Sequence, residues 1–324
     1  MGKLFPEPCP GITTWAVPKK GVWLRENGTE TQTQVGIFNG DLPGSSNKMV
    51  PCMDGFLTVG VPAIRRCRER EWATIDEVGY LETECGAYCD AIRGLMEKTH
   101  VAAVVRKQDT PFLQELIHRP DVFLMDLDAP YGNLGCVIMA SGLGKRFGGN
   151  KLMAEFDGAP MICRALDATE GIFSKRVVVT RHKDVAELCR EKGITAVLHD
   201  LPYRSDTVRL GLDAVGDVQG CMFCPGDQPL LQQETVAALA LAAVNNPETI
   251  WRTAFEGTPG APVVFPRWAF PEMAALPDGK GGGYVVRRHP EALRTVCALS
   301  QWELTDVDHP ETLAELEQQC RRIQ

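Results

Sequence analysis

The 324-residue sequence predicts an α/β protein of two units, with a doubly wound, mostly parallel sheet in the second unit. Three observations support this prediction. Short apolar and β-branched runs alternate with helical segments of about 10–15 residues along most of the chain. A cluster of turn-forming residues, DAPYGNLG at 128–135, separates two such series. The hydrophobic content of 44% and the charged content of 23% are ordinary for a globular protein.

In the second unit, predicted strands and predicted helices alternate. Strands are expected at 136–140, 176–180, 195–200, 220–225, 261–265 and 293–299, and helices at 161–173, 184–193, 205–215, 232–244 and 310–320. Units of this βαβ kind build parallel sheets, whose ligands lie beyond the carboxyl ends of the strands. The loops that follow 136–140 and 220–225 are therefore the expected places of the chemistry.

The turn cluster sets the expected boundaries of the units. We expect a smaller α/β domain over 1–130, a linker at 131–135, and a second domain over 136–324. Within the first domain, residues 21–39 predict a hairpin, because Asn27-Gly28 supplies a tight turn. The remaining predicted elements are strands at 71–82, 101–107 and 122–128 and helices at 86–98 and 110–117.

Composition excludes several classes of protein. The net charge of -8 argues against a broad nucleic-acid surface, which would need a basic stripe. No run approaches 18 apolar residues, so no membrane span is expected. The twelve cysteines are scattered and no secretion signal is evident, which favours a reduced, cytoplasmic protein. Cys221 and Cys224 form a lone CxxC in an apolar run, and a structural role is expected for them.

The stretch ASGLGKRFGGNK at 140–151 follows the first strand of the second unit and has the composition of a phosphate-binding loop. Glycines let backbone N–H groups approach phosphate, and the three basic residues can neutralise it. The loop is not a Walker A motif, because Arg146 rather than Ser or Thr follows its Gly-Lys pair. The glycines at 142, 144 and 148 are also one residue too widely spaced for the GxGxxG dinucleotide motif.

Five motifs in the expected order make the second unit resemble the MobA-like nucleotidyltransferases. The segment MASGLGKRFGGNKLM resembles the LxxGxSxRMGxxK signature, with Gly144 in place of serine and Phe147 in place of methionine. PGDQPLL, YRSDTVRLGL, GAPVVF and TDVDHPETL resemble the later motifs of that family. The resemblance covers about 135–320 and implies a Rossmann-like nucleotidyltransferase fold.

The resemblance also implies roles for particular residues. The catalytic group would be Lys145, Arg146, Lys151 and Asp227. The nucleotide would be bound by Ala140, Ser141, Gly142, Leu143, Gly144, Lys151, Ser205 and Asp206. The expected cofactor is Mg²⁺, a hard cation that prefers carboxylate and phosphate oxygens, with Asp227, Asp306 and Asp308 as its ligands.

Simpler interpretations of these residues stay open. Asp227 can stabilise the turn that follows it, and Lys145 and Arg146 can belong to a solvated face. Ser205 and Asp206 can simply cap a helix, as can Asp306 and Asp308. These alternatives involve no ligand.

The motifs also suggest a substrate. MASG at 139–142 is nearer to the TAAG of cytidylyl-transferring relatives than to the LAGG of guanylyl-transferring ones. The resemblance therefore implies transfer from CTP, rather than GTP, to molybdopterin, with release of pyrophosphate, as in molybdenum cofactor cytidylyltransferases. Two alternatives remain: transfer to another phosphate acceptor such as a sugar phosphate, and a non-catalytic nucleotide-binding maturation factor that serves a client molybdoenzyme.

The first unit resembles a different family. ATIDEVGYLE at 73–82 is similar to the Walker B segment of small P-loop nucleoside triphosphatases, which implies that Asp76 approaches magnesium and Glu77 polarises water. The Walker A loop of that family would lie before Met1. We therefore expect this domain, as written, to lack its phosphate cradle, because the start is truncated or because the domain serves as a scaffold or a partner-binding module.

Overall fold

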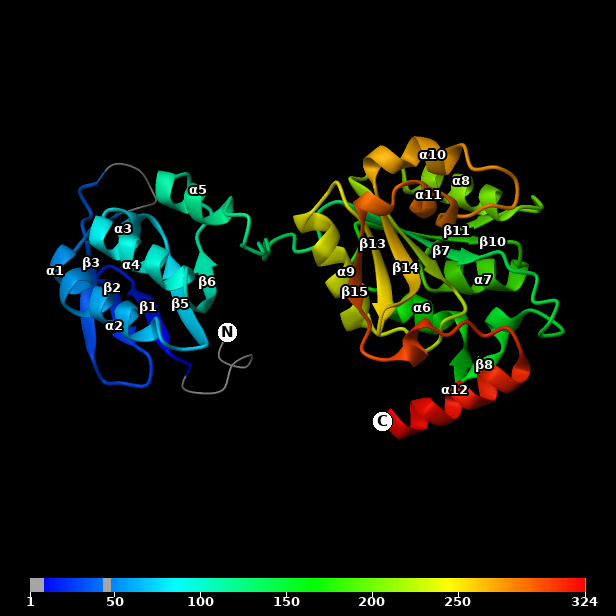
Figure 1. Ribbon diagram of the computed structural model, residues 1–324, viewed down its shortest axis with the longest axis horizontal. Helices are drawn as coiled ribbons and strands as arrows, with labels where there is room; N and C mark the ends of the chain where they lie inside the picture. The colour runs from blue at the N-terminus through cyan, green and yellow to red at the C-terminus, as the bar shows by residue number, and fades with distance from the viewer. Residues whose placement is uncertain (1–8, 43–47, 324) are drawn as a thin grey trace. The chain divides into compact units, whose positions relative to one another are not determined.

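The computed structural model describes residues 9–42 and 48–323 and has a mixed α/β fold. The chain divides into two compact units, Met1–Val122 and Phe123–Gln324, which are described separately below (Figure 1). The expected linker at 131–135 lies in the second of these units, and its last two residues already belong to strand β7 (Leu134–Ala140). None of the helices in the described ranges combines the length and apolarity that crossing a bilayer requires.

The first unit contains a six-stranded mixed sheet. Its order is β4 (Met49–Pro51), β3 (Gln32–Phe38), β2 (Gly21–Glu26), β1 (Gly11–Val17), β5 (Trp72–Val78) and β6 (His100–Val105). Strands β1, β5 and β6 run parallel, whereas β1 to β4 form an antiparallel meander. The predicted hairpin is confirmed as β2 and β3, with Gly28 at φ +73° in the turn between them.

Helices cover one face of this sheet. They are α1 (Met53–Gly55), the π-helical turn η1 (Phe56–Gly60), α2 (Val61–Cys67), α3 (Tyr80–Thr83), α4 (Gly86–Met96) and α5 (Pro111–Ile117). The core places Ile12 and Ile75 of the sheet in one cluster with Ile64 and Tyr88 of the helices. Helix α5 begins as predicted, because the Thr110 side chain accepts a hydrogen bond from the Leu113 N–H group.

The second unit contains a seven-stranded sheet. Its order is β11 (Thr195–Leu198), β10 (Lys175–Thr180), β7, β12 (Gly220–Pro225), β14 (Thr258–Pro266), β13 (Ile250–Phe255) and β15 (Leu293–Cys297), with a separate two-stranded ribbon of β8 (Glu155–Phe156) and β9 (Ala159–Pro160). The four strands from β11 to β12 are parallel, and β14 is antiparallel to both of its neighbours.

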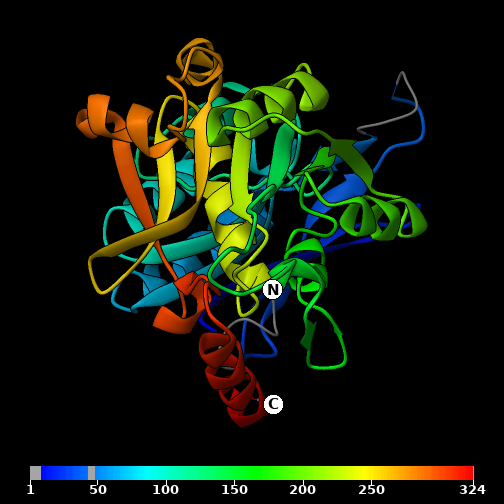
Figure 2. The ribbon, with the colours of Figure 1, turned by 90° about the vertical axis from the view of Figure 1, so that its right-hand side faces the viewer.

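Helices lie on both faces of this sheet, so the doubly wound prediction is confirmed. They are α6 (Ile162–Ala168), α7 (Lys183–Glu191), α8 (Arg204–Val215), α9 (Gln233–Asn245), α10 (Phe270–Ala274), α11 (Gly283–Arg288) and α12 (Pro310–Ile323). The short 3₁₀ turns are η2 (Lys151–Met153), η3 (Arg267–Ala269), η4 (Pro290–Ala292) and η5 (Gln301–Leu304). Figures 1 and 2 show α12, in red, extending at the carboxyl end of this unit.

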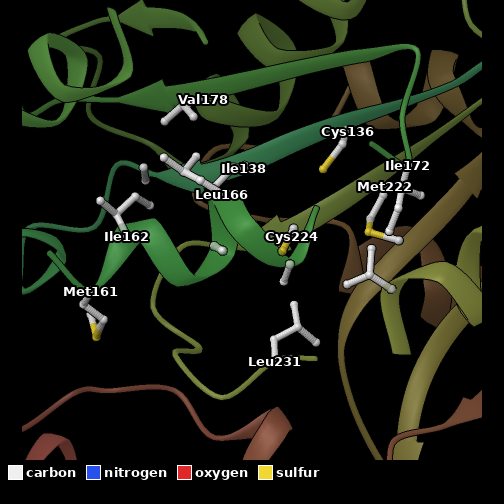
Figure 3. Close-up of a cluster of buried hydrophobic side chains, with 14 of the residues drawn as sticks. Cys136, Ile138, Met161, Ile162, Leu166, Ile172, Val178, Met222, Cys224 and Leu231 are labelled. Carbon is white, nitrogen blue, oxygen red and sulfur yellow. The ribbon is translucent and has the colours of Figure 1, made fainter. Parts of the chain in front are cut away.

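The alternation of side chains along β7 divides the core into two layers. Cys136 and Ile138 point to the layer that contains α6, α7 and α9, which Figure 3 shows in close-up. Val137 points to the opposite layer, where α8, α10 and α11 pack. Cys221 and Cys224 are fully buried in β12, and burial raises the pKa of the Cys224 thiol to about 12, which agrees with a structural role.

Several elements differ from the sequence predictions; β1, α2, α10 and α11, for example, have no predicted counterpart. The predicted strand at 122–128 is wrong, because this segment is irregular and leaves Phe123 57% and Leu127 75% exposed. An apolar run forms a strand only if a neighbouring strand pairs with it, and this run connects the two units instead. Strand β13 has no counterpart among the predicted elements, because its sequence, IWRTAF, mixes polar and apolar residues without a clear period.

Candidate active site

The loop at 141–150 joins β7 to the turn η2 at the carboxyl edge of the parallel strands. Gly144 has φ +59° and Gly148 φ +85°, and the carbonyl of Gly144 accepts hydrogen bonds of 3.0 Å from the N–H groups of Phe147 and Gly148. A Cβ atom at Gly144 would lie 2.0 Å from the carbonyl oxygen of Gly149. Glycine is therefore required where the family signature has serine.

Lys151 lies at the centre of the site. Its side chain is only 8% exposed, and its Nζ atom is 2.6 Å from Asp227 Oδ2 and 3.1 Å from Asp308 Oδ1. Burial alone would lower the pKa of this ammonium, but the two carboxylates outweigh burial, so the pKa is raised. The same contacts, led by the hydrogen bond from Lys151, lower the pKa of Asp308.

Main-chain hydrogen bonds bring distant segments together around Asp227. The N–H of Gly226 donates to the carbonyl of Met139 at 3.1 Å, which ties the end of β12 to the end of β7. The N–H of Val307 donates to the carbonyl of Asp227 at 2.9 Å, which brings the 306–308 segment to the same edge. The predicted residues Asp227 and Asp308 are thus neighbours, although they are 81 positions apart (308 − 227) in the sequence.

Asp306 is held by a residue that the sequence does not single out. The buried side chain of Gln228 donates from Nε2 to Asp306 Oδ1 at 2.8 Å and to the carbonyl of Leu304 at 3.3 Å. Partial burial and the negative charge of Asp227 raise the pKa of Asp306. A carboxylate whose charge is disfavoured in this way is stabilised by any cation that approaches it.

The two remaining predicted cations differ in their contacts. Arg146 is 67% exposed and reaches Asp308 Oδ2 at 2.9 Å. Lys145 is exposed, and no ion pair is found for it among the described residues. Both cations are carried by the glycine loop, and Lys145 extends toward solvent.

The donor chemistry suits a hard divalent cation. Asp227, Asp306 and Asp308 offer only oxygen atoms, and burial, together with the negative charge of Asp227, raises the pKa of Asp306. Within the described ranges, no group of three or more His, Cys, Asp or Glu side chains is arranged for metal ligation. Lys151 lies where it neutralises two of the three aspartates. Metal binding by these aspartates therefore remains a prediction.

Ser205 and Asp206 are placed at the start of α8. The Asp206 carboxylate accepts a hydrogen bond from the Tyr203 N–H at 2.9 Å and pairs with Arg209. These contacts, led by Arg209, lower the pKa of Asp206. Ser205 is fully buried. Both side chains contribute to the helix terminus, and their nucleotide contacts remain a prediction.

Three residues near the loop are absent from the sequence predictions. His182 and Asp184 follow β10, and His199 follows β11. The imidazole Nε2 of His182 is 2.8 Å from the Gly142 carbonyl, and that of His199 is 2.8 Å from Ser141 Oγ. Since His182 and Asp184 come soon after the strand predicted at 176–180, and His199 lies near the end of the strand predicted at 195–200, their position at the carboxyl edge is the available signal. Nothing in the sequence shows which loop they contact.

The acidic pair of the first unit has a different environment. Glu77 forms an ion pair with Arg106, and the carbonyl of Asp76 accepts a hydrogen bond of 3.0 Å from Thr14 Oγ1. The Glu77 N–H also donates to that hydroxyl, at 2.9 Å. The carboxylate expected to polarise water is thus already engaged by a cation.

Comparison with known proteins assigns the two parts of the chain. Residues 136–293 match the MobA-like NTP transferase domain family, and residues 22–131 match the NTPase family. A 3-deoxy-manno-octulosonate cytidylyltransferase from Alkalilimnicola ehrlichii is 36% identical over 115 residues. That match covers 32% of this chain and 42% of the relative, so the chain spans less than half of that protein.

Solved structures support the fold of the second unit. A nucleotidyl transferase from Methanothermobacter thermautotroptrophicus superimposes with a TM-score of 0.52 at 21% identity, over 59% of this chain and 99% of that one. A 4-diphosphocytidyl-2C-methyl-D-erythritolsynthase from Anaerococcus prevotii gives a TM-score of 0.50 at 14% identity, over 61% of this chain and all of that one. The predicted Rossmann-like nucleotidyltransferase fold is confirmed.

The second unit is therefore a nucleotidyltransferase domain by its fold and family. The chain as a whole joins a MobA-like NTP transferase domain to an NTPase domain that precedes it.

Proposed function

We propose that the second unit transfers a cytidylyl group from CTP, with Mg²⁺, to a phosphorylated acceptor, and that the acceptor is molybdopterin. The observation that carries this proposal is the group formed by Lys151, Asp227 and Asp308 beside the glycine loop. It combines a buried cation, carboxylates and backbone N–H groups at one edge of the sheet. Attack on a nucleoside triphosphate needs these elements, because the reaction redistributes about four negative charges.

Each residue has a definite task in this reaction. The loop N–H groups, Lys145 and Arg146 bind the triphosphate, and Asp227, with Asp306 or Asp308, holds the metal ion. Mg²⁺ would neutralise phosphate charge and orient the reacting groups when bound. An oxygen of the acceptor phosphate forms a bond to the α-phosphorus, while the bond to the bridging oxygen of the β-phosphate breaks and pyrophosphate leaves. Because the attacking phosphate is already anionic, no strong general base is required.

Sequence and relatives support CTP as the donor. The MASG segment at 139–142 resembles the cytidylyl-transferring branch, and two of the similar proteins have names that indicate cytidylyl chemistry. The name of the curated relative states a sugar-acid acceptor, which makes acceptors other than molybdopterin, including sugar phosphates, specific alternatives. No disulfide bond is found among the cysteines of the described residues, which agrees with the proposal of a reducing compartment such as the cytoplasm.

The test is to incubate the full chain with Mg²⁺, one nucleoside triphosphate and one acceptor, and to measure pyrophosphate release. The acceptors are molybdopterin, a sugar phosphate and 3-deoxy-manno-octulosonate. We expect release with CTP and molybdopterin, and loss of at least about a thousandfold in Asp227→Ala. Glu234→Ala, which removes an exposed carboxylate from α9, is the matched control and should keep its activity.

The outcomes separate the alternatives. Release with GTP instead of CTP would overturn the choice of nucleotide. Release only with a sugar phosphate or the sugar acid would overturn the choice of acceptor. Nucleotide binding without turnover for any acceptor would identify a maturation factor that hands nucleotide or cofactor to a client molybdoenzyme.

A further inference from the structure

Hydrogen bonds to three side chains fix the two ends of the glycine loop. At its start, Ser141 contacts His199 and the Gly142 carbonyl contacts His182. At its end, Asn150 Nδ2 donates to both oxygens of Asp184, at 2.9 and 3.0 Å. We call His182, Asp184 and His199 the loop clamp. All three follow β10 or β11, so the clamp links the loop to the neighbouring parallel strands.

The proton positions in two of these bonds are determined by their partners. A carbonyl oxygen can only accept, so Nε2 of His182 carries the hydrogen that is donated to Gly142. Ser141 Oγ donates its own hydrogen to the Val179 carbonyl at 3.1 Å, so Nε2 of His199 must donate to that hydroxyl. Burial and the nearby positive charge of Arg181 lower the pKa of His199, which therefore remains neutral at physiological pH.

The middle of the loop is largely exposed. Leu143, Lys145 and Arg146 are exposed, and Cβ atoms built at Gly148 and Gly149 would meet nothing within 4 Å. Besides the turn closed on Gly144, its contacts are the packing of Phe147 against the core and the ion pair of Arg146 with Asp308, and the clamp adds to them by fixing the ends of the loop. Ordering such a segment costs conformational entropy, so fixed ends reduce what a ligand must supply.

We propose that the loop clamp is a set of positioning residues that preorganises residues 143–149 for a nucleoside triphosphate. This inference rests on the proposed function, because it gives the loop a triphosphate ligand. The clamp residues act on the loop and not on the reacting atoms. Their loss should therefore weaken nucleotide binding while leaving the chemical step nearly unchanged.

The clamp can be removed without losing the helix that carries most of it. His182 is the N-terminal cap of α7, but its side chain makes no capping hydrogen bond. His182→Ala should therefore leave α7 intact, and His182→Gln should restore the bond, because the glutamine amide can also donate to the Gly142 carbonyl. Glu187→Ala is the matched control for Asp184→Ala, since Glu187 is an exposed acid one turn further along the same helix.

The experiment uses the full chain and two measurements. Steady-state kinetics with CTP should show KM raised about three- to tenfold in His182→Ala and Asp184→Ala, with kcat within twofold of the parent chain. Hydrogen exchange of the amides at 141–150, measured without ligand, should be several-fold faster in the same variants. His182→Gln and Glu187→Ala should behave as the parent chain in both measurements.

Unchanged exchange in His182→Ala and Asp184→Ala would overturn the proposal, as would a loss of kcat at constant KM. Failure of the proposed function can be distinguished from failure of the clamp proposal. If no acceptor supports pyrophosphate release, direct calorimetric titration with CTP and the exchange rates still test the clamp. Weaker CTP binding together with faster exchange would support the clamp in the absence of transfer, and CTP binding unchanged by the variants would refute it.

Discussion

Both units place acids at the end of a parallel strand, and within the described residues the second unit alone surrounds those acids with a glycine loop and a buried cation. In the second unit, Asp227 follows β12 beside a glycine loop and shares Lys151 with Asp308. In the first unit, Asp76 and Glu77 lie on β5, and Glu77 is paired with Arg106. The difference shows that carboxylates at the end of a strand are not sufficient to form a site. A neighbouring loop that presents N–H groups and cations is needed as well.

The sheets of the two units also differ in burial. Strand β7 is buried at six of its seven residues because helices pack on both faces of its sheet. Strand β1 has only Gly11 and Ile12 buried, and Trp15 and Trp23, which are paired across β1 and β2, are half-buried. A strand packed on both faces holds its terminal loop more rigidly, which suits a site that depends on precise placement.

The largest expected effect separates the chemistry of the two units. Asp227→Asn should lower pyrophosphate release by about a thousandfold or more, because it removes the charge proposed to hold the metal ion. Glu77→Gln should change it less than twofold. Phosphate release from nucleoside triphosphates, measured in parallel, reports on the first unit. Hydrolysis that survives Asp227→Asn but disappears in Glu77→Gln would show that the first unit has a working site of its own.

The next effect concerns the packing of the strands. Ile138→Ala in β7 should lower the free energy of unfolding by about 2–5 kcal/mol, because the side chain is fully buried. Val104→Ala in β6 should cost about 1 kcal/mol, since that valine is only half-buried. Both losses of stability can be measured by chemical denaturation, with hydrogen exchange reporting on each unit separately. Equal losses would contradict the contrast between sheets packed on two faces and on one.

A smaller effect follows from the buried charge of the site. Lys151→Met should lower the stability of the second unit by about 2 kcal/mol, because it leaves Asp227 without its cation and Asp308 with only the exposed Arg146. Lys145→Met should cost less than about 0.5 kcal/mol, since that side chain is exposed. The Tm values of the two variants can be compared by thermal unfolding in buffer that contains a chelator. Similar Tm values for the two variants would show that Lys151 does not compensate the aspartates.

The smallest expected effect depends on pH. The pKa of Asp306 is raised in the folded protein, so its ionised form destabilises the fold at neutral pH. Asp306→Asn should raise Tm by about 1–2 °C at pH 7, a small gain because water screens this partly exposed group. As the pH falls through the raised pKa and then below the unfolded value of about 3.9, the carboxylate becomes protonated in both states, so the gain should shrink and then disappear. A gain that persists undiminished at pH 4 would exclude this electrostatic origin. The variant should also lose transfer activity if Asp306 helps to hold the metal ion.

Sequence motifs locate much of the candidate site. Lys151, Asp227, Asp308 and Arg146 belong to motifs far apart in the chain, and the folded protein places them in contact. Gln228 gives no sequence signal because a single amide has no distinctive spacing, although it orients Asp306. The clamp histidines escape prediction for a related reason, since isolated histidines form no sequence pattern.

The sequence by itself determined the alternation of strands and helices, the glycine loop and the order of the motifs. These features depend on local periodicity, backbone freedom and spacing, which neighbouring residues decide. Only the tertiary structure decided that Lys151 bridges two aspartates, that Glu77 is paired with Arg106, and that strand-end residues hold the loop. Those contacts join segments that are 29 to 157 positions apart, and they form because the packed sheet brings the ends of its strands to one edge.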